Sequence, residues 1–184
     1  ASSSATVNLV KANIVKSKSA YNDTKKGAAG TVDQGDFVTY TLTTSNTGSV
    51  AVDYTVSDNI SDVLKNADIV SISDSGSVSD GTISWPAVNI CAGQSVVRTF
   101  QVKIKSTVSN VCFVNTYGNS VQLCVPAKVV SPSLHIDKLV RDVTTNEENF
   151  SKSNQAKAGD TLEYIINYSN TGDGAADKVV FSDV

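Results

Sequence analysis

The feature that most constrains this chain is an internal repeat whose period is as long as a domain. Residues 35–42 read Gly-Asp-Phe-Val-Thr-Tyr-Thr-Leu and lead to Ser-Asn-Thr-Gly at 45–48. The same pattern returns as Gly-Asp-Thr-Leu-Glu-Tyr-Ile-Ile at 159–166, with Ser-Asn-Thr-Gly at 169–172. The offset is 124 residues, from Gly35 to Gly159. A solenoid rung is far shorter, so the repeating unit is predicted to be a whole domain.

A third landmark extends the repeat and suggests its limits. Val-Ser-Asp, ending at Asp58, is matched by Phe-Ser-Asp, ending at Asp183, one residue before the last residue of the chain. We therefore expect one complete module and the first part of another. The predicted organisation is an N-terminal arm at 1–12, a complete β-sandwich at 13–126, a linker at 127–133 that holds Pro132, and a partial repeat at 134–184.

Composition favours strands and argues against several function classes. The chain has 40% hydrophobic and 18% charged residues, and Ser, Thr, Asn, Asp and Gly make up most of the polar remainder. A net charge of −3 without a basic stripe argues against nucleic-acid binding. No apolar run is long enough to span a membrane. Met is absent even at position 1, so we expect that a leader was removed or that the chain is a fragment.

Short apolar and β-branched runs, separated by turn residues at intervals of about ten, predict an all-β fold. Candidate strands are residues 13–19, 36–44, 51–57, 67–73, 82–85, 95–105, 111–117 and 120–125. Only residues 60–66 look helical, as a short turn that Asp58 could N-cap. The predicted fold is an immunoglobulin-like antiparallel β-sandwich.

Three cysteines are present, and two of them flank a predicted hairpin. In a hairpin centred near Gly118, Cys112 and Cys124 stand opposite each other, so the sequence predicts a cross-strand disulfide. The alternative is two buried thiols. Cys91 would then be unpaired, or would bond outside the chain.

Six motifs in order resemble the domain-of-unknown-function-eleven conserved repeat. They are the Gly-Asp-x-Val-x-Tyr-x-Leu and Ser-Asn-Thr-Gly runs, Val-Ser-Asp-Asn-Ile, Ile-Ser-Trp-Pro, Ala-Gly-Gln-Ser-Val-x-Arg-Thr-Phe-x-Val, and Asn-Thr-Tyr-Gly-Asn at 115–119, with the partial second set at 134–184. This resemblance implies an immunoglobulin-like module of large bacterial and archaeal surface proteins, with a stalk, adhesin or envelope role outside the cell. The fold supplies no ligand of its own.

A related set of surface modules, the collagen-adhesin type, joins its first strand to its last through a Lys–Asn isopeptide bond promoted by an acid. The positions that match here are Lys16, Asp58 and Asn115, and Lys138 is taken as the counterpart of Lys16. The alternative is a solvent-facing Lys16, a capping Asp58 and an Asn115 that satisfies backbone groups.

The sequence offers no catalytic motif. The single histidine, His135, has no acid or nucleophile at motif spacing, and three cysteines without paired histidines do not make a zinc site. We therefore expect no enzyme activity and no cofactor. Calcium stays open because several aspartates fall in predicted turns, although no Asp-x-Asp-x-Asp-Gly run exists. These aspartates are Asp53, Asp58, Asp62, Asp74 and Asp80.

Three functions are consistent with these observations. The first is a non-enzymatic structural module of a secreted or cell-surface protein, whose partners are neighbouring repeats or other copies. The second is a filament subunit completed by strand donation, with the donor strand at Thr6, Val7, Asn8, Leu9 and Val10. The third is a binding domain for a host or matrix protein or a glycan, for which Trp85, Tyr54 and Tyr117 could form a stacking surface; the interpretation we prefer places Trp85 in the core.

Overall fold

The computed structural model describes residues 10–183. Two compact units divide the chain between Lys128 and Val129. The described residues of the first unit form almost entirely antiparallel strands, with one short helix, α1 (Ser61–Asn66). The all-β sandwich predicted from the strand spacing is confirmed.

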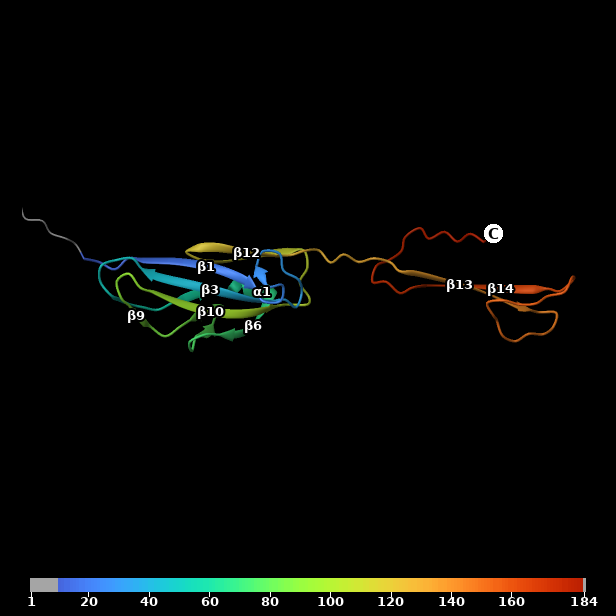
Figure 1. Ribbon diagram of the computed structural model, residues 1–184, viewed down its shortest axis with the longest axis horizontal. Coiled ribbons are helices and arrows are strands. Elements are labelled where there is room, and N and C mark those ends of the chain that lie inside the picture. Colours follow the sequence, from blue (N-terminus) through green and yellow to red (C-terminus); the bar gives the residue numbers. More distant parts are fainter. Residues whose placement is uncertain (1–9, 184) are drawn as a thin grey trace, which may run out of the picture. The chain divides into compact units, whose positions relative to one another are not determined.

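A five-stranded sheet forms one layer of the first unit. Its strand order is β2 (Gly27–Ala28), β1 (Ile14–Asn22), β3 (Phe37–Asn46), β10 (Ser95–Ile104) and β6 (Ala67–Ile72), and Figure 1 shows the four longer strands running side by side. Every second residue of β3, from Val38 to Asn46, is buried. This period of two is what a strand needs when only one of its faces meets the core.

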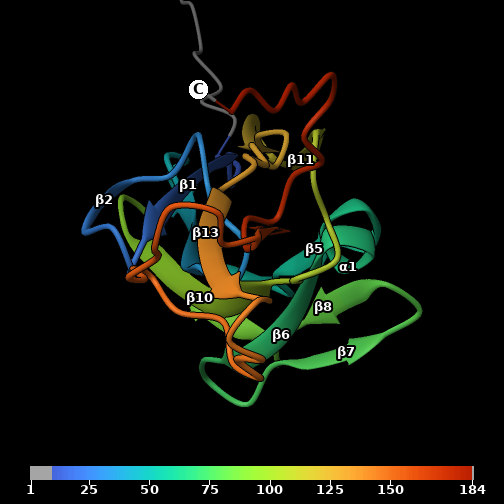
Figure 2. The same ribbon diagram turned by 90° about the vertical axis from the view of Figure 1, so that its right-hand side faces the viewer.

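Smaller sheets complete the unit on the other side of the core. They are β4 (Val52–Tyr54) with β9 (Val88–Ile90), β5 (Ser57–Asn59) with β8 (Thr82–Ser84) and β7 (Ser77–Ser79), and the hairpin of β11 (Val111–Tyr117) with β12 (Asn119–Val125). Figure 2 shows β7, β8 and α1 beyond the edge of the large sheet at β6.

One hydrophobic core joins these layers. Tyr40 and Leu42 of β3 and Phe100 of β10 pack with residues of the smaller sheets, among them Phe113, and with Trp85. Trp85 is 2% exposed and donates its indole N–H to the carbonyl of Ser73 at 2.8 Å. The preferred interpretation of Trp85 as a core residue is therefore confirmed.

The hairpin has the predicted register. Cys112 is paired directly with Cys124 across β11 and β12, their Cα atoms are 4.0 Å apart, and the two residues form a disulfide. Cys91 is free and exposed.

The second unit repeats the start of the first. Its strands β13 (Leu134–Asp142) and β14 (Leu162–Asn170) pair as β1 and β3 do. The Ser-Asn-Thr-Gly motif makes the same contacts in both copies: the side-chain oxygens of Asn46 and Asn170 accept the backbone N–H of Gly48 and Gly172, each at 3.0 Å.

Two expectations need correction. Strands β2, β5, β7 and β9, each two or three residues long, were not predicted. Asp58 does not cap α1, because the residue before the helix is Ile60 and no side chain caps it; the carboxylate of Asp58 points into the core instead.

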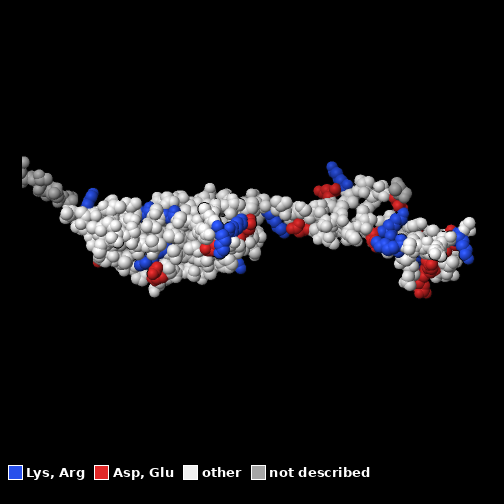
Figure 3. Space-filling model, viewed as in Figure 1, with Lys and Arg blue, Asp and Glu red and all other residues white. Residues whose placement is uncertain are grey.

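The surface carries no strong field of one sign on the face shown in Figure 3, where Lys and Arg atoms lie among Asp and Glu atoms and much of the first unit carries neither. In the described part of the chain, no helix has the length and apolar character of a membrane span.

Candidate functional site: a buried lysine, aspartate and asparagine

The centre of the site is an ion pair inside the first unit. Lys18 of β1 places its Nζ 2.7 Å from Oδ1 and 2.6 Å from Oδ2 of Asp58 on β5. Both side chains are completely shielded from solvent. Burial of two charges carries a large desolvation cost, so such a pair needs close geometry and further hydrogen bonds.

Asn115 of β11 supplies one of these hydrogen bonds. Its Nδ2 donates to Oδ2 of Asp58 at 3.0 Å, and Asn115 is 1% exposed. The same carboxylate oxygen therefore contacts both the amine and the carboxamide. In contrast, Oδ1 of Asn115 is buried and has no hydrogen-bond partner in the structure.

Two aromatic rings lie beside the amine of the cluster. Nζ of Lys18 lies 5.8 Å from the ring centre of Tyr40 and 6.0 Å from that of Tyr117. Burial lowers the pKa of Lys18 to about 8, although its hydrogen bond and attraction to Asp58 act in the opposite direction. Burial, assisted by the nearby Asp58 charge, raises the pKa of the Tyr40 phenol.

The turn of the β11–β12 hairpin packs against β1 beside the cluster. Asn119 accepts the backbone N–H of Lys18 at 2.7 Å and donates to its carbonyl at 2.9 Å. Gly118 has φ +78°, and a Cβ at this position would lie 2.0 Å from the carbonyl oxygen of Lys16. Tyr117 shares a 2.5 Å hydrogen bond with Thr44. The Asn-Thr-Tyr-Gly-Asn motif thus supplies the contacts that hold the hairpin against the first strand.

The structure corrects the predicted lysine. Asp58 and Asn115 meet as expected, but the amine that joins them belongs to Lys18. Lys16 is exposed, and its Nζ lies over the rings of Tyr54 and Tyr117, 5.5 Å and 5.1 Å from their centres. A hydrogen bond to Tyr54 raises the pKa of Lys16, whereas a reactive buried amine needs the opposite shift. Both lysines are on the same face of β1, so strand alternation alone does not separate them.

The second copy identifies the same lysine independently. Lys18 is paired with Leu42 in the first hairpin, and Lys138 is paired with Ile166, the counterpart of Leu42, in the second. Lys138 therefore corresponds to Lys18. Between the last paired residues of each hairpin, copy two has four more residues (143–161 against 23–37), and this difference misaligned the lysines in the sequence.

Copy two also repeats the partners of this lysine. Nζ of Lys138 lies 2.6 Å from Oδ1 and 2.8 Å from Oδ2 of Asp183, the counterpart of Asp58. It lies 4.6 Å from the ring centre of Tyr164, the counterpart of Tyr40. Lysine, aspartate and tyrosine thus recur as a set.

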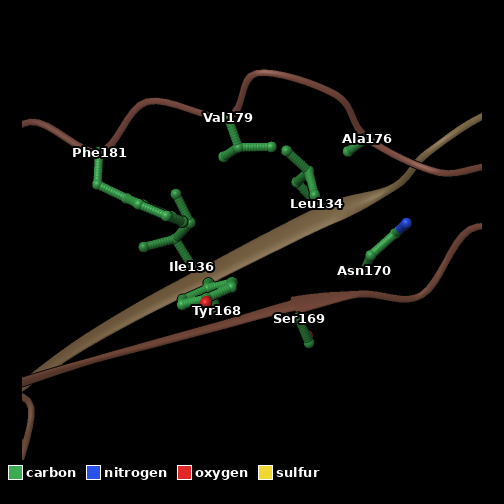
Figure 4. Close-up of a pocket in the computed structure, with 8 residues that line it drawn as sticks. All are labelled: Leu134, Ile136, Tyr168, Ser169, Asn170, Ala176, Val179 and Phe181. Atoms are coloured by element: carbon green, nitrogen blue, oxygen red, sulfur yellow. The ribbon is translucent and has the colours of Figure 1, made fainter.

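An apolar pocket lies in the second unit (Figure 4). Ile136, Tyr168 and Phe181 face one another there, and Tyr168 is 67% exposed. Tyr168 corresponds to Thr44, which is fully buried and bonded to Tyr117 of the hairpin in the first unit. The pocket thus corresponds to the surface on which the β11–β12 hairpin packs in the first unit, and we do not assign it a ligand.

The turn aspartates hold structural partners. Asp62 accepts the backbone N–H of Val114 at 3.0 Å, Asp53 accepts the amide of Asn89 at 2.8 Å, Asp74 pairs with Arg98 at 3.3 Å, and Asp80 accepts the Ser79 hydroxyl at 3.2 Å. Residues 10–183 contain no group of three or more His, Cys, Asp or Glu side chains that could hold a metal ion.

The remaining predicted residues do not form a site. Trp85 and Tyr117 are buried, so they cannot form an exposed stacking surface with Tyr54. His135 is exposed on β13, opposite Ser169. Of the predicted donor strand, Thr6, Val7, Asn8 and Leu9 lie outside the described residues, and Val10 is exposed.

Comparison with known families gives a match that covers most of the first unit. The model of a family described as a domain of unknown function (DUF7927) matches residues 14–136, which include β1, the whole hairpin and the buried cluster. No curated protein matches the chain.

Proposed function

We propose that this chain, which belongs to the DUF7927 family, is a non-enzymatic structural module of an extracellular or cell-surface protein and carries tension between neighbouring repeats. One observation carries the proposal. The cluster of Lys18, Asp58 and Asn115 is closed to solvent and ties β1 to β5 and β11. A sealed cluster cannot receive a substrate, but it can hold strands together.

The direction of the chain explains why this tie matters. A force applied along the chain enters the first unit at β1 and leaves after β12. The hairpin of β11 and β12 contacts β1 through Asn119 and through the buried cluster, so the contact between first and last strands lies on the path of the force. Such a module resists extension at the point where extension would begin.

Two further observations support an extracellular setting. The Cys112–Cys124 disulfide is typical of oxidising compartments. The tandem repeat, and the resemblance of its motifs to the domain-of-unknown-function-eleven conserved repeat, are typical of long surface proteins built from similar modules.

The proposal is tested in two ways. Single-molecule pulling of the chain from its ends should show a first unit that resists extension at high force, and Asp58→Ala should lower the force at which this unit extends while Asp53→Ala leaves it unchanged. On intact cells of the source organism, an added protease or antibody should reach the protein. An unfolding force that is insensitive to Asp58, or a protein found only inside the cell, would contradict the proposal.

A second candidate function, assembly of copies through strand donation, is favoured by the exposed apolar face of β13 and β14. Ile136, Tyr164 and Tyr168 are each more than half exposed on these strands. A donated strand would pair with the edge of this two-stranded sheet through main-chain hydrogen bonds and would cover the face with its side chains. Sedimentation at rising concentration tests this candidate: larger species with protected amides in residues 6–12 would support it, and a monomer at every concentration would exclude it.

A further inference from the structure

The buried cluster has a chemical property that a simple structural tie does not require. It holds a primary amine and a carboxamide against the same carboxylate, with Lys18 Nζ at 2.6 Å and Asn115 Nδ2 at 3.0 Å from Oδ2 of Asp58. An amine, an amide and an acid are the three groups required for transamidation, in which one amide nitrogen replaces another.

The unsatisfied oxygen of Asn115 indicates which arrangement is reactive. A buried acceptor without a partner is costly and calls for an explanation. The oxygen and nitrogen of a carboxamide exchange places when the group turns over. In the turned orientation, the oxygen of Asn115 faces Asp58 Oδ2 and accepts a hydrogen bond from the acid when Asp58 carries a proton.

The surroundings favour the neutral amine. Both charged side chains are fully shielded, and the rings of Tyr40 and Tyr117 line the position of the amine. Transfer of one proton from the Lys18 ammonium to Asp58 converts a buried ion pair into two neutral groups. The lowered pKa of Lys18, about 8, is consistent with this transfer.

We propose that Lys18 and Asn115 become joined by an intramolecular amide bond, with Asp58 as the catalytic acid and base. The bond would connect the first strand, β1, to the penultimate strand, β11, of the module. This inference goes beyond the proposed function, because the bond would form whether or not the chain carries tension.

The reaction balances without any co-reactant. The ammonium of Lys18 gives one proton to Asp58, and the neutral Nζ attacks Cγ of Asn115 while protonated Asp58 polarises the carbonyl oxygen. A second proton passes from Nζ through Asp58 to Nδ2, the Cγ–Nδ2 bond breaks, and ammonia leaves. A new C–N bond replaces the old one, and nothing is oxidised or reduced.

The second copy provides an internal control. Lys138, Asp183 and Tyr164 repeat three members of the cluster, but the ion pair is partly exposed and the described residues of this unit provide no asparagine on its aspartate. Lys138 should therefore stay a free amine in the same molecule in which Lys18 has reacted.

The decisive experiment is the intact mass of the full chain, denatured and reduced. We expect a mass lower than that of the sequence by one ammonia, about 17 Da. Proteolysis should yield a branched peptide that joins Lys18 to Asn115, and an amine-reactive reagent should label Lys138 but not Lys18. A mass equal to that of the sequence, or a branch at another lysine, would overturn the proposal.

Variants define the chemistry. Asp58→Ala, Asn115→Ala and Lys18→Arg should each restore the full mass, whereas the matched control Lys16→Arg should retain the loss. A loss that survives Lys18→Arg would indicate cyclisation of an asparagine and would also overturn the proposal. Because the wild-type branched peptide is decisive by itself, a variant that fails to fold does not prevent the test. A chain without the amide bond that still resists extension at high force would reject the amide and retain the proposed function. A chain that carries the amide bond but is found only inside the cell would retain the amide and reject the proposed function.

Discussion

The two copies place the same ion pair in opposite environments. Lys18 and Asp58 are fully buried, while the side chains of Lys138 and Asp183 are 40% and 54% exposed. The closest distance between the charged atoms is 2.6 Å in both pairs. Residue identity and the distance between the charged atoms are therefore shared, and only the surroundings differ.

The difference comes from the β11–β12 hairpin. In the first unit it brings Asn115 onto the carboxylate, Tyr117 beside the amine and Asn119 onto the backbone of β1. An exposed pair in water contributes little, whereas a buried pair interacts strongly and depends on every partner. The comparison shows that burial by the hairpin, and not the presence of lysine and aspartate, makes the cluster a site.

The largest predicted effect removes the aspartate from each copy. In the unlinked variant Asn115→Ala, the further change Asp58→Ala leaves a buried amine without its partner and should lower the free energy of unfolding of the first unit by about 3–5 kcal/mol. Asp183→Ala should cost under about 1 kcal/mol in the second unit, because that pair is exposed. Urea unfolding followed by fluorescence reports the first unit alone, since Trp85 is the single tryptophan. Amide hydrogen exchange in β13 and β14 reports the second unit. Equal costs in the two copies would refute the role of burial.

The next largest effect is a pH dependence of the stability, which arises from Lys18 when the amide bond is absent. In Asn115→Ala the amine stays free, and its pKa is about 8 when folded and about 10.4 when unfolded. Between these values the unfolded chain binds more protons, so stability should rise with pH, by up to roughly 3 kcal/mol over the full interval. The measurement is the urea midpoint of Asn115→Ala from pH 7 to 10, compared with the double variant Asn115→Ala/Lys18→Met.

The double variant supplies the control because it retains Tyr40 and every other titrating group. Parallel pH curves for the two proteins would show that Lys18 does not titrate in this range. The exposed Lys138 is present in both and cancels.

A smaller effect is expected from the disulfide, which also belongs to the hairpin. Reduction of Cys112–Cys124 frees a loop closed over a sequence separation of 12 residues and should destabilise the first unit by about 2–3 kcal/mol. Hydrogen exchange in β13 and β14 should not change. Differential scanning calorimetry with and without reductant, and with Cys112→Ser/Cys124→Ser as the control, measures this loss. A second unit that also loses protection would contradict the assignment.

Local sequence patterns predicted much of this fold. The features that depend on strand register or on contacts between distant segments could not be predicted. Strict alternation along β3 and the symmetry of the hairpin about Gly118 are properties of neighbouring residues, so the strands and the disulfide could be predicted from the sequence. The choice between Lys16 and Lys18 depends on a loop that is four residues longer in one copy, and both lysines share a face. Strands such as β5 and β9 are three residues long and show no periodicity. The depth of Asp58 is set by packing of distant segments, so capping was the wrong interpretation of that residue.

The smallest predicted difference concerns the asparagine of the Ser-Asn-Thr-Gly motif. Asn46 is fully buried and donates to the carbonyls of Val50 at 2.7 Å and Ile90 at 3.0 Å, whereas Asn170 is exposed and donates to Gly174 at 2.7 Å. Asn46→Ala leaves the buried Ile90 carbonyl without its donor and should cost about 2 kcal/mol, measured by urea unfolding with Trp85 fluorescence.

Asn170→Ala removes equivalent bonds in a setting that water reaches, so we expect under about 1 kcal/mol, measured by hydrogen exchange at Gly172. Asn46→Asp is the matched control, because it retains an acceptor for Gly48 but donates to neither carbonyl when ionised. If Asn46→Ala and Asn170→Ala had the same effect, the motif would act through the local turn alone, since that turn is the part that both copies share. A larger cost at Asn46 would extend the rule found at Lys18: each copy makes the same local contacts, and burial decides how much they contribute.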